Sequence, residues 1–307
     1  MITSLSAAPT LAPEDILVVG CLRNEMLRLP EFLSHHRQLG VTQFLLIDNA
    51  SDDGTTDFLL AEGDVCVFHT AEPYSASNCG VDWINEVLHR HGTGHWVLLL
   101  DADELFVFPG YETTGLNTLL TWLDTCQAEA MIAPMLDMYS HAPLARTNYV
   151  RGTSLIEACP YFDGTGYTFR QTETGLRTLH RGGPRQRLFW DGHGRDYPAP
   201  VLDKIPLVKW RDDLRLTAST HVLKGVAAAP VTGALLHFKF LQDFAASAAA
   251  EAARQEHFMA ARQYTAYSDV LSAAPDFCAF GEVSVKYRGS RQLVELGLMQ
   301  VPPGYPF

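Results

Sequence analysis

The chain has 307 residues, of which 47% are hydrophobic and 19% charged, which is the balance of a globular protein and not of a disordered one. This length is enough for one large α/β domain or two small ones with a substantial core. The formal net charge of -12 argues against broad electrostatic attraction to nucleic acid or an anionic membrane, so a nucleotide-binding role requires local positive charge.

Strand and helix patterns alternate in the first half of the chain. Apolar runs predict strands at residues 16–22, 44–47, 65–68 and 96–100. Helical spacing predicts helices at 29–39, where Gly40 ends the pattern, and then at 83–91 and 116–123. Residues 51–54 read as a turn and helix cap. This alternation predicts an α/β fold with a mainly parallel sheet flanked by helices.

The second half is less regular. From residue 139 to about 206 the pattern dissolves into Gly, Pro, aromatic and Arg residues, and long irregular segments of this kind tend to be functional. Residues 187–190 and 205–210 look like short strands. Residues 235–240 form a further strand or lead into the next helix. An Ala-rich helix is expected from about 243 to 264.

The location of the protein is predicted from what its sequence lacks. Residues 1–15 contain no Lys or Arg and no apolar core of a secretory signal, and no later segment is long enough for a membrane span. We therefore expect a cytoplasmic protein without a transmembrane segment. Six cysteines without a C-x-x-C pair favour buried free thiols over a zinc site or disulfides: Cys21, Cys66, Cys79, Cys126, Cys159 and Cys278.

Residues 96–104 read Trp-Val-Leu-Leu-Leu-Asp-Ala-Asp-Glu and contain the main functional signal. An apolar run that ends abruptly in carboxylates predicts a strand buried on both faces, with Asp101 and Asp103 at its carboxyl end. With Glu104 next to them, these carboxylates repel one another unless a cation offsets their charge. Mg²⁺ or Mn²⁺ suits oxygen ligands and leaves positions for a diphosphate. The alternative is an ordinary turn after a core strand.

Three motifs follow successive predicted strands in a fixed order. They are Arg23-Asn24-Glu25, Ile47-Asp48-Asn49-Ala50-Ser51-Asp52-Asp53-Gly54-Thr55 and Leu100-Asp101-Ala102-Asp103-Glu104. Together they resemble glycosyltransferase family 2, and more narrowly its bacterial branch with a late His-Phe-Lys-Phe segment, here residues 237–240. The resemblance covers about the first third of the chain and the segment around His237.

The resemblance implies a GT-A fold and a glycosyltransferase of the hexosyltransferase type. The donor would be a nucleoside-diphosphate sugar, most often a UDP-sugar, and the cofactor Mn²⁺ or Mg²⁺. An acceptor hydroxyl on an unknown glycan, lipid or protein would be glycosylated, with inversion. The chain would divide into a tail (1–14), a nucleotide-sugar and metal-binding half (15–138), an acceptor-side half of the same domain (139–240) and a C-terminal helical extension (241–307).

The resemblance also implies roles for individual residues. Asp48 would accept hydrogen bonds from the nucleoside, although a turn-capping Asp is the alternative. The loop over the same pocket would hold Arg23, Asn24 and Glu25, of which Glu25 could instead begin a helix.

The metal would be bound mainly by Asp103. Asp101 would lie near the ribose or the metal, and His237 would complete the metal shell. The alternatives are a core histidine at 237 and His221 as the ligand.

One departure from the family concerns the diphosphate. Family members often carry Ala-Arg-Asn-x-Gly before the fourth strand, whereas residues 76–80 read Ala-Ser-Asn-Cys-Gly, so Asn78 is present and the Arg is not. Another cation must then face the diphosphate. The basic segment 170–215 offers Arg185 and Lys204, although most Arg in such a segment are solvated or paired with acids.

An inverting transfer also needs a carboxylate that takes the acceptor proton. The resemblance points to Asp191 as this base, because it follows the metal motif at a distance comparable to that of the base in family members. The alternatives are Asp163, Glu173 and Asp196. Nearby aromatic residues could stack on a sugar acceptor or build core: Trp190, Tyr197 and Trp210.

Two other functions are compatible with the sequence. A degenerate transferase could bind sugar or nucleotide without catalysis. A phosphatase of the haloacid dehalogenase type also has Asp-x-Asp after an apolar strand, with the first Asp as nucleophile. That motif usually opens the chain and has Thr or Val two residues on, where this chain has Leu105.

Overall fold

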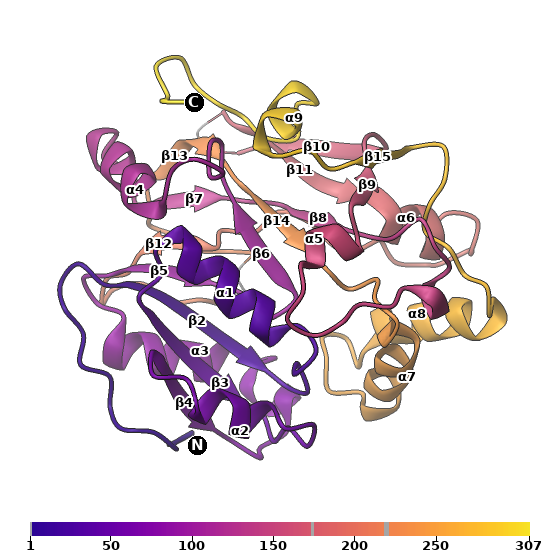
Figure 1. Ribbon diagram of the computed structural model, residues 1–307, viewed down its shortest axis with the longest axis horizontal. Helices are drawn as coiled ribbons and strands as arrows, with labels where there is room; N and C mark the ends of the chain where they lie inside the picture. Colours follow the sequence, from indigo (N-terminus) through magenta and orange to yellow (C-terminus); the bar gives the residue numbers. More distant parts are fainter. Residues whose placement is uncertain (1, 173–174, 218–220) are drawn as a thin grey trace.

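The computed structural model describes residues 2–172, 175–217 and 221–307. Its centre is an eight-stranded sheet in which β4, β3, β2 and β5 are neighbours and run parallel (Figure 1). The predicted α/β class, a mainly parallel sheet with flanking helices, is confirmed. In spatial order the strands are β1 (Thr3–Ser4), β4 (Val65–His69), β3 (Gln43–Asp48), β2 (Ile16–Leu22), β5 (Trp96–Leu99), β12 (Leu207–Lys209), β7 (Ala130–Ile132) and β13 (Ala228–Thr232).

Helices cover both faces of the parallel strands, as Figure 1 shows for α1 (Leu29–Leu39) and α3 (Val81–His91). In β2 the buried residues alternate, so that Ile16 and Val18 belong to the core under α1, whereas Leu17 and Val19 belong to the core around α3. Such a strand must be apolar along its whole length, which is why it was visible in the sequence. Two further helices are α2 (Thr55–Leu60) and α4 (Leu116–Thr125).

The strand predicted at 96–100 is β5, and it is buried on both faces as expected. Trp96 and Leu98 lie in one core cluster, whereas Val97 and Leu99 lie in the other. The chain turns after Leu100 and continues as β6 (Glu104–Val107). The acidic residues therefore occupy the turn between two strands.

A second sheet of three strands places His237. Its order is β6, β14 (Ala234–His237) and β8 (Met135–Asp137), with β14 antiparallel to β6 and parallel to β8. The register sets His237 opposite Glu104 on one side and Asp137 on the other. Two antiparallel pairs complete the strands: β10 (Tyr167–Gln171) with β11 (Arg177–Gly182), and β9 (Tyr161–Asp163) with β15 (Ser284–Lys286).

The C-terminal segment is helical, as predicted, but the single helix expected at 243–264 is wrong. The chain forms α7 (Phe244–Arg254) and α8 (Arg262–Ala273), which pack side by side, and later α9 (Ser290–Glu295). Between α7 and α8, Gln255 and Ala261 have positive φ angles of 56° and 57°, which end one helix and precede the next. These are not glycines, so composition gave no signal of the break.

Two other expectations for the second half need correction. Residues 187–190 do not form a strand, because α6 (Gly183–Phe189) begins with Pro184 in its first turn. The segment 139–206 is also more regular than expected, since it includes α5 (Leu155–Ala158) and β9 to β11. Two short 3-10 helices are η1 (Tyr74–Ser77) and η2 (Leu144–Arg146). Within the described ranges, no helix combines the length and apolar character needed to cross a bilayer.

A glycine in β2 permits the close approach of the acidic turn. A Cβ atom on Gly20 would lie 2.3 Å from the backbone oxygen of Leu100, the residue before Asp101. A side chain at this position would push the end of β5 away from β2.

We predict that Gly20→Ala lowers the free energy of unfolding by about 1–3 kcal/mol, because the added methyl group overpacks a buried contact with backbone. Urea denaturation measures this change. The control is Gly63→Ala, where an added Cβ has no atom within 4 Å. Equal midpoints for the two variants would contradict the steric constraint.

Candidate functional site

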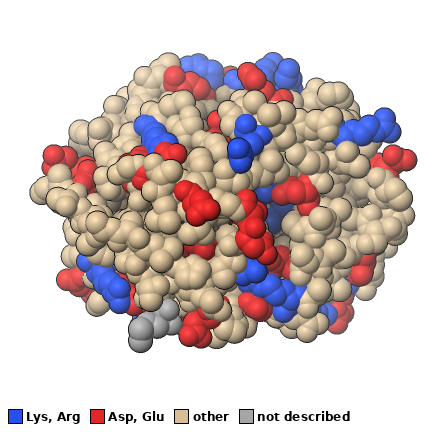
Figure 2. All heavy atoms as spheres, turned by 60° about the horizontal axis from the view of Figure 1, so that its bottom comes forward, with Lys and Arg blue, Asp and Glu red and all other residues tan. Residues whose placement is uncertain are grey.

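The carboxyl ends of β2, β3 and β5 meet at a cleft of about 320 Å³. This is the edge of an α/β sheet at which ligands gather. On the face that Figure 2 shows, acidic and basic side chains lie side by side around a hollow near the middle. The cleft is lined by Cys21, Leu22, Arg23, Asn24, Glu25, Arg28, Asn49, Tyr74, Asp101, Ala102, Asp103, His237, Lys239, Asp243, Ser247, Ala250, Glu251, Arg254, His257 and Tyr264.

Two other grooves lie elsewhere on the molecule. One runs beside α3 between Asp82 and Arg215, and the other surrounds Lys209 and Trp210. Neither is lined by the residues that follow β2, β3 or β5. The strand-end cleft is therefore the stronger candidate for a ligand site.

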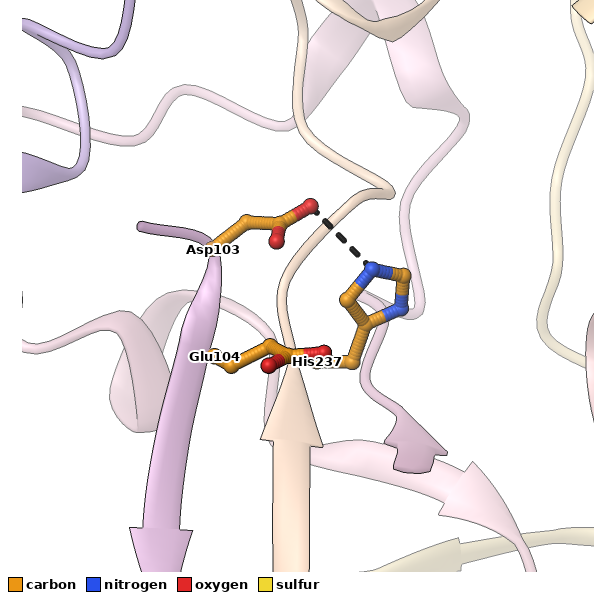
Figure 3. Close-up of side chains that lie close together, drawn as sticks. All are labelled: Asp103, Glu104 and His237. Atoms are coloured by element: carbon orange, nitrogen blue, oxygen red, sulfur yellow. Dashed lines mark ion pairs between the residues drawn. The ribbon is translucent and has the colours of Figure 1, made fainter. Parts of the chain in front are cut away.

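Asp103 and His237 form an ion pair at this cleft (Figure 3). The Nε2 atom of His237 lies 3.1 Å from Oδ2 of Asp103, and its Nδ1 atom lies 2.5 Å from Oδ1 of Asp137. Asp137 in turn accepts a 2.8 Å hydrogen bond from Nε of Arg185. Because all four side chains are almost fully buried, each charge depends on its neighbour.

The two carboxylates change the protonation of His237. Burial alone would lower the pKa of this imidazole, but the attraction of Asp103 and Asp137 outweighs burial and raises it. Burial likewise opposes ionisation of Asp103, yet His237 and Lys239 lower the pKa of its carboxyl well below its usual range. The pair therefore favours a carboxylate beside an imidazolium.

The same residues fit a divalent cation. Asp103, Glu104 and His237 each offer a ligand atom, and these atoms all lie within 4.8 Å of one another. Carboxylate oxygens suit ions such as Mn²⁺, and so does Nε2 of His237 once the cation displaces its proton to solvent. The contact of Asp137 with Nδ1 leaves Nε2 toward the cleft, as an outer-shell carboxylate does in histidine metal sites.

Asp101 lines the cleft beside this group, and its role near the ribose or the metal stays a prediction. Its Oδ2 atom is 2.8 Å from Nζ of Lys204, which is also 2.7 Å from Oε1 of Glu104. Burial raises the pKa of Glu104 to about 7, although Lys204 acts in the opposite direction. Glu104, and not Asp101, joins Asp103 and His237 in the cluster that could hold a metal.

The loop after β2 lines the cleft, and its role in binding a nucleotide stays a prediction. Arg23 donates a 2.7 Å hydrogen bond to the backbone oxygen of Asn49, and Asn24 bonds Asp52 at 2.9 Å. Glu25 lies 3.3 Å from Arg28. Burial raises the pKa of Glu25 to about 7, against the attraction of Arg28.

The other predicted donor residues lie outside the lining of the cleft. Asp48 is fully buried and accepts hydrogen bonds from Thr56 and Ser51, with His69 3.2 Å away. Asn78 is exposed and bonds the backbone of Thr217. Arg185 and Lys204 are buried on their acidic partners.

The predicted base candidates and the second histidine also lie apart from this lining. Asp191 is exposed after α6, and Asp163 is paired with Arg187. Asp196 is exposed and paired with Arg262, whereas Glu173 lies outside the described residues. His221 bonds the backbone of Asp203, and burial lowers its pKa to about 4.

Of the three aromatic residues considered for an acceptor, Trp210 is buried in the core around α3. Trp190 packs against Tyr267, and Tyr197 packs against Trp190. None of the three lines the cleft.

Sequence reasoning missed the wall of the cleft that α7 and α8 supply. Arg28 holds this wall through two hydrogen bonds to Asp243, of 2.8 and 2.9 Å, although the residues are 215 positions apart. No local pattern predicts such a contact. The sequence could have indicated Lys239 as a cleft residue. It follows His237 by two positions, and residues at that spacing in an extended segment point to the same side. The missed wall residues are Asp243, Ser247, Ala250, Glu251, Arg254, His257 and Tyr264.

Comparison with known proteins gives one curated relative. No known family profile matches the chain. A glycosyltransferase family 92 protein of Ricinus communis is 29% identical over 108 residues. The match covers 34% of this chain and spans only 18% of the plant protein's length. It supports a likeness to sugar transferases, and membership of family 2 stays a prediction.

Solved structures give weaker likenesses. HddC from Yersinia pseudotuberculosis has a TM-score of 0.30 and 11% identity, over 55% of this chain and 72% of that one. A 4-diphosphocytidyl-2C-methyl-D-erythritol synthase has a TM-score of 0.28 and 16% identity, over 43% and 65%. A UDP-glucose pyrophosphorylase from Acinetobacter baumanii has a TM-score of 0.26 and 10% identity, over 43% of this chain and 59% of that one. Scores this low carry no argument about function.

We predict that Arg185 stabilises the fold and the Asp137–His237 contact instead of binding a donor. Arg185→Met should lower the free energy of unfolding by about 3–5 kcal/mol, because it leaves a buried carboxylate without its guanidinium. Chemical denaturation measures the loss.

The matched control is Arg146→Met. Arg146 is paired with Asp276 at 3.6 Å, with both side chains exposed, so this change should cost less than about 1 kcal/mol. An Arg185 variant as stable as wild type that no longer bound nucleotide would point to the donor-binding role instead.

Proposed function

We propose that the protein transfers a sugar from a nucleoside-diphosphate sugar, such as a UDP-sugar, to an acceptor hydroxyl with the help of Mn²⁺ or Mg²⁺. The observation that carries this proposal is the Asp103–His237 pair at a cleft formed by the carboxyl ends of three strands. The likeness to a glycosyltransferase of another family agrees with it.

In this proposal Asp103 and His237 hold the cation, with Glu104 as a third ligand. The cation would stabilise the negative charge that develops on the departing diphosphate. On the neighbouring strand ends, Arg23 and Asn49 lie where the nucleoside part of the donor would bind. The hydrogen bond between them joins the loop after β2 to the loop after β3.

An inverting transfer also needs a base, and the cleft suggests Glu25 in place of Asp191. Glu25 lines the cleft, and its pKa of about 7 suits a group that accepts a proton near neutral pH. Asp243 also lines the cleft, but both of its carboxylate oxygens accept hydrogen bonds from Arg28. Release of free nucleotide from a donor sugar would distinguish this enzyme from a protein that only binds the donor.

A phosphatase with Asp101 as nucleophile agrees less well with the structure. The second Asp of that motif would have to act as the acid, but His237 and Lys239 lower the pKa of the Asp103 carboxyl well below its usual range. In the proposed transferase, the acceptor would be positioned by the acceptor-side half (residues 139–240) and the helical extension (residues 241–307).

We predict that Asp103→Asn weakens Mn²⁺-dependent binding of a UDP-sugar at least tenfold and abolishes its turnover, because an amide is a poor cation ligand. Isothermal calorimetry of wild type and variant measures the affinity. A panel of nucleotide sugars, screened by Mn²⁺-dependent thermal stabilisation, first identifies the donor.

The control is Asp57→Asn, which makes the same chemical change at an exposed position of α2. This variant should bind and turn over the donor as wild type does. Equal affinity of wild type and the Asp103 variant would sink the proposed metal site.

A further inference from the structure

Four Arg and Lys side chains line the cleft, and two of them, Arg28 and Arg254, are each within 3.0 Å of a carboxylate. Arg28 donates two hydrogen bonds to Asp243 and one to the backbone oxygen of Phe238. Arg254 lies 3.0 Å from Glu251 and 2.9 Å from Glu256. Both guanidinium groups therefore hold the walls of the cleft together.

Lys239 differs from these two arginines. Its side chain is only 16% exposed, and its Nζ atom lies 3.5 Å from Oδ2 of Asp103. Apart from this ion pair, the ammonium donates no hydrogen bond to the described part of the chain. The rings of Tyr264 and Phe244 lie 5.4 and 6.0 Å from Nζ.

This arrangement leaves N–H donors of Lys239 available to a ligand in the cleft. An ammonium has three donors, and Asp103 at 3.5 Å is the carboxylate paired with it in the described chain. Asp103, its partner, is shared with His237, whose Nε2 atom is closer. An anion that entered the cleft beside Asp103 would accept hydrogen bonds from these donors.

We propose that Lys239 binds a phosphate group of the donor, in place of the arginine absent from residues 76–80. This inference rests on the proposed function for the identity of the ligand. A compact ammonium is a good partner for phosphate oxygens. The two cations favoured by the sequence, Arg185 and Lys204, are buried on Asp137 and on Asp101 with Glu104.

The position of Lys239 also agrees with a role beside the cation site. It follows β14 and so lies near His237 in the chain, and both residues line the same cleft. A diphosphate that reached Asp103 and His237 through a cation would come within the part of the cleft that Lys239 borders. The late His-Phe-Lys-Phe segment would thus supply both a metal ligand and a phosphate ligand.

The test uses Lys239→Met, which removes the charge and keeps most of the side-chain volume. Binding of inorganic pyrophosphate and of UDP is measured by calorimetry at one fixed ionic strength, with and without Mn²⁺. We expect the methionine variant to bind both ligands at least tenfold more weakly than wild type, in either condition. Lys239→Arg should restore affinity to within about threefold, because it restores the charge.

The matched control is Lys209→Met. Lys209 is on β12, has a 43% exposed side chain and is paired with Asp124, so its loss should not change either affinity. Circular dichroism and urea midpoints establish that each variant is folded. If Lys239→Met does not fold, Lys239→Gln provides a second neutral variant.

The outcomes separate this inference from the proposed function. Equal pyrophosphate affinity of wild type and the neutral variant, or no pyrophosphate binding by wild type, would overturn the role of Lys239. A loss of pyrophosphate binding in the variant, in a protein that turns over no nucleotide sugar, would support Lys239 and refute the donor class.

Discussion

The site depends on a series of buried charges, each of which needs its neighbour. The guanidinium of Arg185 holds Asp137, which holds the imidazole of His237, and that imidazole faces Asp103. Removing one member would leave the next as an unpaired buried charge, which proteins rarely tolerate. The series is fixed by backbone pairing, because β14 lies between β6 and β8 and sets His237 opposite Glu104 and Asp137. A rigid sheet therefore determines where the cleft carries its acidic and cationic groups.

Much of the fold could be predicted from the sequence, because strands buried on both faces must be apolar throughout. The runs at 16–22 and 96–100 carried that signal, and Asp103 and His237 were visible as polar residues beside such runs. The sequence could not show that Glu104 lies opposite His237, since register depends on which strands pair. It also could not show that Arg185 and Lys204 form ion pairs with buried carboxylates. Nor could it show that the Ala-rich helix is interrupted by residues other than glycine that have positive φ angles.

The C-terminal helices are part of the cleft in this structure. Arg28, just before α1, bonds Asp243 just before α7, so the wall from α7 and α8 is joined to the sheet edge by a buried clamp. The wall brings Arg254 and several acidic groups to a cleft already bordered by Arg23 and Lys239. A chain with a net charge of -12 needs local positive charge to bind a phosphate-bearing ligand. The Arg and Lys side chains that line the cleft supply this positive charge.

We propose that Asp103 and His237 hold a divalent cation next to a donor diphosphate. Anomalous X-ray scattering from crystals grown with Mn²⁺ and UDP tests this arrangement. We expect a manganese peak within bonding distance of the Asp103 carboxylate and Nε2 of His237, with the diphosphate between that peak and Lys239. A map with UDP in the cleft but no manganese at these two side chains would contradict it.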